Sequence, residues 1–106
     1  MKEEPSAAQK SMGDLAPKLA ELTDKVLFGH IWERKELSKR DRSLITVAVL
    51  VALNRTDQLR FHLQRALENG VKKQELIEEI THLAFYSGWP TAVNAVTVAK
   101  DVFSNL

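Results

Sequence analysis

The stretch LITVAVLVAL, residues 44–53, decides the fold class of this chain of 106 residues. Its β-branched residues would suit a buried strand, but the apolar run is long and no other segment offers a partner strand. Just before it, Ser38 and Asp41 form a possible capping box, which marks the start of a helix. We therefore predict a helix that is apolar on nearly all sides beyond Ser43 and lies at the centre of an all-α fold.

Apolar residues also recur at spacings of three and four on both sides of this stretch, which is the pattern of amphipathic helices. The predicted helices run from about Asp14, with Pro17 in the first turn, to Gly29; from a cap at Thr56 or Asp57 to the Asn69-Gly70 pair; from about Lys73 to Tyr86; and from about Thr91 onward. Residues 1–10 are charged and interrupted by Pro5, so we expect a flexible N-terminal arm. Residues 11–106 then form a compact single-domain bundle of about five to six helices.

The charge and cysteine content exclude several classes of function. The chain carries 15 Lys and Arg against 14 Asp and Glu, which gives no reason to expect nucleic acid or an anionic membrane as a partner. It has no cysteine, which excludes disulfides and cysteine nucleophiles and fits a reducing compartment. Three histidines without an HExxH motif give no reason to expect a metal site. No apolar run reaches the ~20 residues that span a bilayer, and no signal peptide is visible, so we expect a cytoplasmic protein.

His62 lies in QLRFHLQRALENG, residues 58–70, three residues after Leu59 and four before Ala66. It therefore borders the apolar face of its predicted helix. One interpretation is a core histidine that hydrogen-bonds a backbone carbonyl, and its position alone favours that interpretation. The other is a partly desolvated imidazole that titrates near neutral pH and takes part in chemistry.

A second cluster follows in ELIEEITHLAFYSGWP, where Glu78, His82 and Tyr86 are spaced four apart on one stripe and Glu79 stands three residues before His82. A carboxylate that holds an imidazole fixes its tautomer and raises its pKa, which suits a general acid or base. The same spacing is common in ordinary surface pairs, and spacing alone favours that simpler interpretation.

Five arginines crowd the second and third predicted helices: Arg40, Arg42, Arg55, Arg60 and Arg65. A guanidinium group grips a carboxylate through two parallel hydrogen bonds, so these residues are candidates for holding an acidic substrate. A solvated basic face is the simpler explanation for most of them.

Several segments, taken in order, resemble the carboxymuconolactone decarboxylase family: FGHIW, LSKRDRSLITVAVL, QLRFHLQRALENGV, ELIEEITHLAFYSGWP and TAVNA. The resemblance extends over about residues 15–103. It implies the all-helical alkylhydroperoxidase D-like fold, in agreement with the helices predicted above. It also implies a homo-oligomer in which dimers group into a hexamer, a trimer of dimers.

The family that this chain resembles has two chemically different branches. The alkylhydroperoxidase D-like branch uses a CxxCxxxH motif, and if its histidine is His62, its cysteines would fall at Arg55 and Gln58. Ser43 stands where that branch has a glutamate. Thiol–disulfide exchange requires thiolates, so peroxiredoxin activity by that route is excluded.

The chain resembles the decarboxylase branch better. Its namesake converts 4-carboxymuconolactone into 3-oxoadipate enol-lactone and CO2 in the breakdown of aromatic compounds. The resemblance implies that no cofactor is needed, because the conjugated lactone itself accepts the electron pair that CO2 leaves behind. It implies His62 as the proton donor or as the hydrogen-bond donor to the lactone oxygen. His82 and Glu78, singled out by their spacing, are the reserve acid–base pair. The residues assigned to binding the carboxylate or lactone substrate are Arg40, Arg42, Arg60, Tyr86 and Trp89.

Two other functions stay open from the sequence. One is a non-catalytic oligomeric scaffold or small-molecule-binding protein that retains the fold. The other is a lyase or isomerase that acts on a different enolisable acid.

Overall fold

The computed structural model describes residues 4–106, and the regular structure in this range is entirely helical. The predicted all-α class is therefore confirmed. Contacts between residues divide the chain into two compact units, Met1–Leu37 and Ser38–Leu106. This boundary falls inside the single domain predicted for residues 11–106, and that domain assignment stays a prediction.

The first unit contains three helical segments: α1 (Ala7–Met12), α2 (Pro17–Leu22) and the π-helix η1 (Thr23–Ile31). α1 begins inside the predicted arm and ends two residues beyond it, so residues 7–10 are helical. Residues 1–3 lie outside the described range. The Ser6 hydroxyl explains why a helix forms here. Its oxygen accepts a hydrogen bond from the Gln9 amide at 3.1 Å, and it donates to the Asp24 carboxylate of η1 at 2.8 Å.

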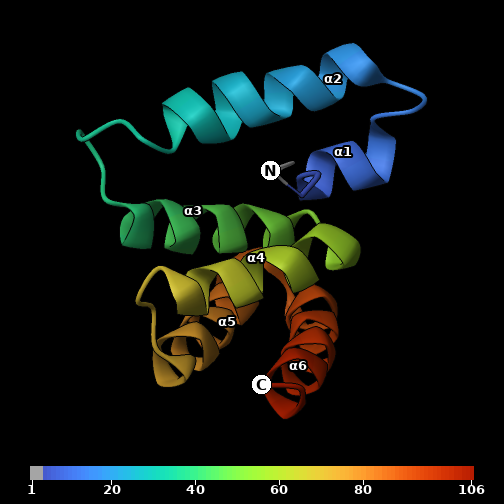
Figure 1. Cartoon of the computed structure of the whole chain (residues 1–106). Helices are drawn as coiled ribbons and strands as arrows, with labels where there is room; N and C mark the ends of the chain where they lie inside the picture. Colours follow the sequence, from blue (N-terminus) through green and yellow to red (C-terminus); the bar gives the residue numbers. More distant parts are fainter. Residues whose placement is uncertain (1–3) are drawn as a thin grey trace. The chain divides into compact units, whose positions relative to one another are not determined.

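α2 begins at Pro17, and Ala16 rather than the predicted Asp14 occupies the N-cap position, without a side-chain hydrogen bond. Pro17 suits the first helical position because an N–H group there would have no partner inside the helix. η1 continues α2 directly, so Figure 1 draws the two as one long rod. The rod passes through Gly29, where the sequence suggested a stop, and its wider turns are seen in the hydrogen bond from the Trp32 amide to the Leu27 carbonyl at 2.9 Å.

The second unit is a bundle of four helices: α3 (Lys39–Ala52), α4 (Thr56–Glu68), α5 (Lys73–Ser87) and α6 (Trp89–Ser104) (Figure 1). α3 contacts each of the other three, which agrees with its predicted central place. The shared core consists of apolar side chains that are at most 8% exposed: Val47, Val51, Leu59, Leu63, Ala66, Val71, Leu76, Ile80, Ala84, Ala92, Ala95, Val98, Ala99 and Val102.

The stretch that decides the fold is a helix, and its start is confirmed in detail. The Ser38 hydroxyl accepts a hydrogen bond from the Asp41 amide at 3.0 Å and so caps α3. One side of α3 stays exposed within the chain. Ile45, Val49 and Leu53 are 53%, 49% and 59% exposed, because the core that α3 shares with the other helices lies on a different side, that of Val47 and Val51.

Two helices of the second unit, α4 and α5, end close to a glycine with positive φ. Gly70 has a φ of 95° just after α4, as predicted, and Gly88 has a φ of 102° between α5 and α6. α6 begins at Trp89, slightly earlier than predicted. The predicted cap of α4 by Thr56 or Asp57 is wrong, because the helix already begins at Thr56 and has no side-chain cap.

Gly70→Ala should destabilise the protein by about 1 kcal/mol, because an L-residue is strained at this positive φ. A Cβ at this position meets no heavy atom within 4 Å, so strain of the backbone is the whole effect. Urea unfolding measures the change. Gly70→Asn is the matched control and should lose less, because asparagine tolerates the left-handed region. An alanine variant as stable as the wild type would contradict this account.

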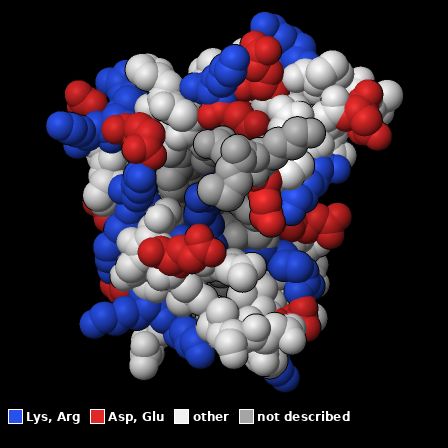
Figure 2. Space-filling view, viewed as in Figure 1, with Lys and Arg blue, Asp and Glu red and all other residues white. Residues whose placement is uncertain are grey.

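Figure 2 shows Lys and Arg side chains interspersed with Asp and Glu across one face of the molecule. Exposed ion pairs such as Lys18–Glu21, at 3.1 Å, are screened by solvent, so this mixture has little effect on stability. Its main consequence is that neither a positive nor a negative electrostatic potential dominates this face. Within the described residues, no helix combines the length and the apolar character needed to cross a membrane.

Candidate functional site

His62 lies on α4 between three fully buried core residues, Leu59, Leu63 and Ala66, and is itself half-buried. Its ring meets the edge of Phe61 at a centroid distance of 5.0 Å and an angle of 86°. Burial lowers the pKa of His62 below its usual value, and the positive charge of Arg65, one turn further along α4, lowers it in the same direction. The imidazole is therefore neutral at pH 7, a form that donates a hydrogen bond but is a poor source of protons.

Glu79 is a candidate functional residue that is absent from the site predicted from the sequence. It lies between Leu76, Ile80 and Leu83 of α5, which belong to the core or pack against it. One of its carboxyl oxygens, Oε1, is buried and has no hydrogen-bond partner within residues 4–106. Burial raises the pKa of Glu79 to about 7. The spacing of three and four from core leucines is the sequence signal that predicts this burial.

The predicted stripe of Glu78, His82 and Tyr86 exists on α5, and all three side chains are exposed. The rings of His82 and Tyr86 lie 5.0 Å apart between centroids at an angle of 33°. No ion pair joins Glu78 to His82 in the described part of the chain. The geometry therefore fits the surface-pair interpretation better than a carboxylate–imidazole pair.

Arg40 is engaged with acidic groups of the protein itself. It pairs with Glu75 of α5 and lies 3.6 Å from the Asp41 carboxylate. The Lys72 amide donates to the Glu75 carboxylate at 2.9 Å, and this bond, with Arg40 as the second cause, holds the pKa of Glu75 below its usual value. The Arg40–Glu75 pair therefore joins the start of α3 to the start of α5.

The other two arginines assigned to substrate binding lie elsewhere. Arg60 of α4 pairs with Asp101 of α6 beside a shallow cavity of about 150 Å³. Arg42 is half-buried on α3. Arg40 and Arg60 thus belong to different helix pairs, and each already holds a carboxylate.

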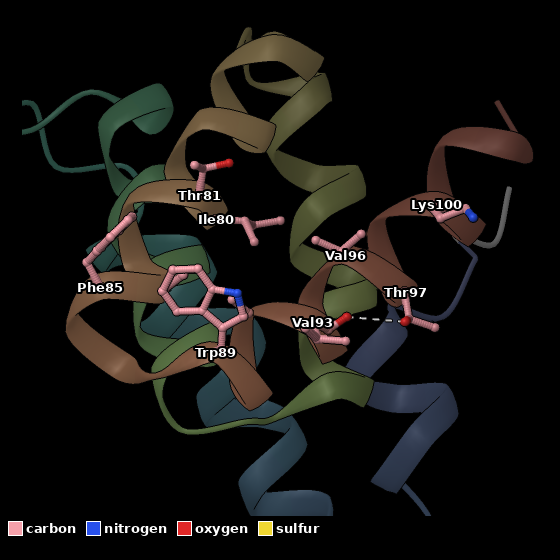
Figure 3. Close-up of a pocket in the computed structure, with 10 residues that line it drawn as sticks. Ile80, Thr81, Phe85, Trp89, Val93, Val96, Thr97 and Lys100 are labelled. Carbon is pink, nitrogen blue, oxygen red and sulfur yellow. Dashed lines mark hydrogen bonds between the residues drawn. The ribbon is translucent and has the colours of Figure 1, made fainter.

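Trp89 lines an apolar groove of about 510 Å³ between α5 and α6 (Figure 3). The groove residues are Ile80, Thr81, Ala84, Phe85, Trp89, Ala92, Val93, Val96, Thr97 and Lys100. The rings of Phe85 and Trp89 meet edge to face at 5.1 Å, and the Thr97 hydroxyl is bound to the Val93 carbonyl at 3.2 Å. Lys100 is the one charged residue in this lining, so the groove suits an apolar partner better than a dianionic acid.

The predicted site residues come from several helices. The structure places Arg40 and Arg42 on α3, Arg60 and His62 on α4, and the stripe of Glu78, His82 and Tyr86 on α5. It also shows two half-buried titratable groups, His62 on α4 and Glu79 on α5. The pKa of His62 is lowered and the pKa of Glu79 is raised. Both displacements favour the neutral form, as burial does in general.

An all-helical fold with a half-buried histidine and carboxyl group, and without any cysteine, agrees with the class of protein inferred from the sequence. The chain belongs to the carboxymuconolactone decarboxylase family, whose pattern matches residues 17–101. It is 38% identical over 97 residues to 4-carboxymuconolactone decarboxylase of Acinetobacter baylyi. The aligned region covers 92% of this chain and 72% of that protein. The chain is 29% identical over 86 residues to nitrosuccinic acid decarboxylase npaB of Metarhizium robertsii, covering 81% of this chain and 60% of the relative.

Proposed function

We propose that this protein is a cofactor-free decarboxylase that acts on a carboxylated lactone of the 4-carboxymuconolactone type or on a related small acid. The observation that carries the proposal is the 38% identity to a 4-carboxymuconolactone decarboxylase over 92% of the chain. A second relative of this chain is also named a decarboxylase, for a different small acid.

The substrate explains how such a reaction proceeds without a cofactor. The departing carboxylate of 4-carboxymuconolactone is attached to the carbon γ to a conjugated lactone carbonyl. When the C–C bond to CO2 breaks, its electron pair moves through the double bond onto the lactone oxygen. The protein then has three tasks: to hold the dianionic substrate, to stabilise the dienolate oxygen, and to protonate the carbon α to the carbonyl.

His62 is the residue we assign to the dienolate oxygen. Of the two roles that the resemblance implies for it, its lowered pKa supports hydrogen-bond donation by a neutral imidazole over proton donation by an imidazolium. A neutral donor that is half-buried also interacts more strongly with a developing negative charge than an exposed one does. Arg40, Arg42 and Arg60 are the candidates for holding a substrate carboxylate, and Arg40 and Arg60 would have to exchange Glu75 and Asp101 for it.

The direct test is turnover of 4-carboxymuconolactone by the purified protein, followed as CO2 release and as formation of 3-oxoadipate enol-lactone. Nitrosuccinic acid serves as the parallel substrate, since it distinguishes the two kinds of decarboxylase among the relatives. Turnover that persists after treatment with a chelator supports the cofactor-free reaction. A protein that releases CO2 from neither acid would contradict the proposal.

A non-catalytic small-molecule-binding or scaffold protein is the second candidate. The observation in its favour is the apolar groove between α5 and α6, which has a single charged lining residue, Lys100. Tight binding of an apolar ligand in that groove, together with no turnover of either acid, would favour this candidate.

The protein should show no thiol-dependent reduction of hydroperoxides, because its 106 residues contain no cysteine to form a thiolate. The measurement is consumption of an organic hydroperoxide in the presence of a dithiol, with buffer alone as the control. Metal is removed beforehand so that traces of iron do not react with the peroxide. Turnover above the control would contradict the prediction.

The protein should also self-associate, and we propose the trimer of dimers that the resemblance implies. Large apolar side chains remain exposed on several helices of the single chain, among them Val49 at 49%, Phe85 at 73% and Val93 at 54%. Exposed apolar area on this scale is unfavourable in water unless another surface covers it. Light scattering at micromolar concentration should give a mass several times the 12.0 kDa of one chain. A mass of one chain across a dilution series would refute self-association.

A further inference from the structure

Glu79 poses a problem that the packing of α5 does not explain. Its position between Leu76, Ile80 and Leu83 is one where an apolar side chain would be expected. Instead a carboxyl group is present, with Oε1 buried and without a hydrogen-bond partner in the described range 4–106. A buried polar atom without a partner costs free energy, so its presence in a native protein calls for an explanation.

Other acidic groups on α5 and α6 do not share this property. Glu75 is paired with Arg40, Asp101 is paired with Arg60, and Glu78 is exposed. Across residues 4–106, Glu79 holds the one carboxyl oxygen that is both buried and without a hydrogen bond. The cost is therefore specific to this side chain and does not reflect a generally polar helix interface.

We propose that Glu79 is the general acid that protonates the substrate carbon α to the lactone carbonyl. This inference rests on the proposed decarboxylase function. In the reaction, the bond between the γ carbon and CO2 breaks and CO2 leaves without the electron pair. The pair forms the dienolate, whose α carbon then takes the proton as the O–H bond of Glu79 breaks. Glu79 becomes a carboxylate and regains a proton from water, so one proton is consumed for each CO2 released.

The surroundings of Glu79 suit this role. Burial raises the pKa of Glu79 from the ordinary glutamate value of 4.5 to about 7, which keeps its protonated form well populated at neutral pH. The side chain is only partly buried, so water can return the proton after each turnover. A general acid works best when its pKa lies near the working pH.

The charges on the elements packed against Glu79 do not offer another explanation. On α5 itself, Glu75, Glu78 and His82 lie within one turn. From α3, Arg40 is committed to Glu75; on α6, Lys100 lines the groove with Ile80 and Thr81, and Asp101 is paired with Arg60. The displaced pKa of Glu79 accordingly has burial as its only cause.

The test is Glu79→Gln, which keeps the size of the side chain but holds no transferable proton. We expect kcat for 4-carboxymuconolactone to fall by about a hundredfold or more, with a much smaller change in KM. The wild-type kcat should decrease as pH rises through about 7, where the acid form is lost, and the variant should lack this decrease. Glu68→Gln removes the same charge from an exposed position of α4 and should leave both kcat and its pH profile unchanged.

The outcomes distinguish a failure of the role of Glu79 from a failure of the proposed function. If the wild type turns over the lactone and Glu79→Gln does so at a similar rate with the same pH profile, the role of Glu79 is refuted while the proposed function stands. If the wild type is inert, the proposed function has failed and the role of Glu79 fails with it. Should Glu79→Gln not fold, Glu79→Asp replaces it. The pH at which kcat decreases must then follow the pKa of the new acid, measured by ¹³C NMR, and an unshifted decrease would refute the proposal.

Discussion

Leucine in place of His62 should lower kcat for the proposed decarboxylation by about a hundredfold to a thousandfold, the usual cost of removing one hydrogen-bond donor from a developing oxyanion. Glutamine at the same position should retain much more activity, because its amide still donates a hydrogen bond. This order follows from the lowered pKa of His62, which makes the neutral ring the working form. Steady-state kinetics of the two variants at pH 7 provides the comparison.

The same two variants separate the three roles that His62 could have. A proton-transfer residue would lose activity in both variants, because neither leucine nor glutamine exchanges protons. A purely structural histidine would leave kcat intact in both, and the variants would differ only in their free energy of unfolding. Equal losses of activity, or no loss in either, would therefore contradict hydrogen-bond donation by His62.

Glu79→Gln should stabilise the protein above pH 7 and lose this advantage in acid. The folded pKa of Glu79, about 7, lies above the unfolded value of 4.5. The proton held by the folded state therefore contributes stability that is complete below pH 4.5 and is lost as pH rises through 7. Above that range the wild type has a partly buried, charged carboxylate at position 79, whereas the variant has a neutral amide there. Because the side chain is partly exposed, we expect a difference of about 1–2 kcal/mol, less than the full shift implies.

Urea unfolding of both proteins at several values between pH 5 and pH 8.5 measures this difference. The comparison cancels the opposite contribution of His62, whose lowered pKa adds stability above its unfolded value of 6.5 and loses it in acid. Glu68→Gln again controls for the loss of one negative charge. A difference between wild type and Glu79→Gln that does not change with pH would contradict the raised pKa.

Local signals in the sequence predicted most of the fold, because the features that set helix ends act over a few residues. Ser38 caps α3 through the amide of Asp41, three residues away, and Gly70 ends α4 through its own φ. α1 was missed because its stability depends in part on Asp24, eighteen residues beyond Ser6. The π form of η1 was missed as well, because apolar spacing alone does not distinguish its wider turns from those of an α-helix.

The candidate site was harder to predict, because it depends on contacts between residues far apart in the chain. No local pattern indicates that Arg40 pairs with Glu75 or Arg60 with Asp101, because the partners are separated by 35 and 41 residues. The sequence identified His62 through the resemblance. The spacing from His82 singled out Glu78, which is exposed. The adjacent Glu79, on another side of the helix, is the partly buried one.

The junction at Gly88 has a mechanical consequence for the groove. α5 ends at Ser87 and α6 begins at Trp89, so the two walls of the groove are joined through the single residue Gly88, which would be the pivot of any change in their angle. α6 has 16 residues and is therefore a lever of about 24 Å. A swing of about 10° around Gly88 would barely alter the spacing of Phe85 and Trp89 near the pivot, but it would move the far end of α6 by about 4 Å. Any change in the angle between α5 and α6 would therefore alter the width of the groove more at Lys100 than at its aromatic pair.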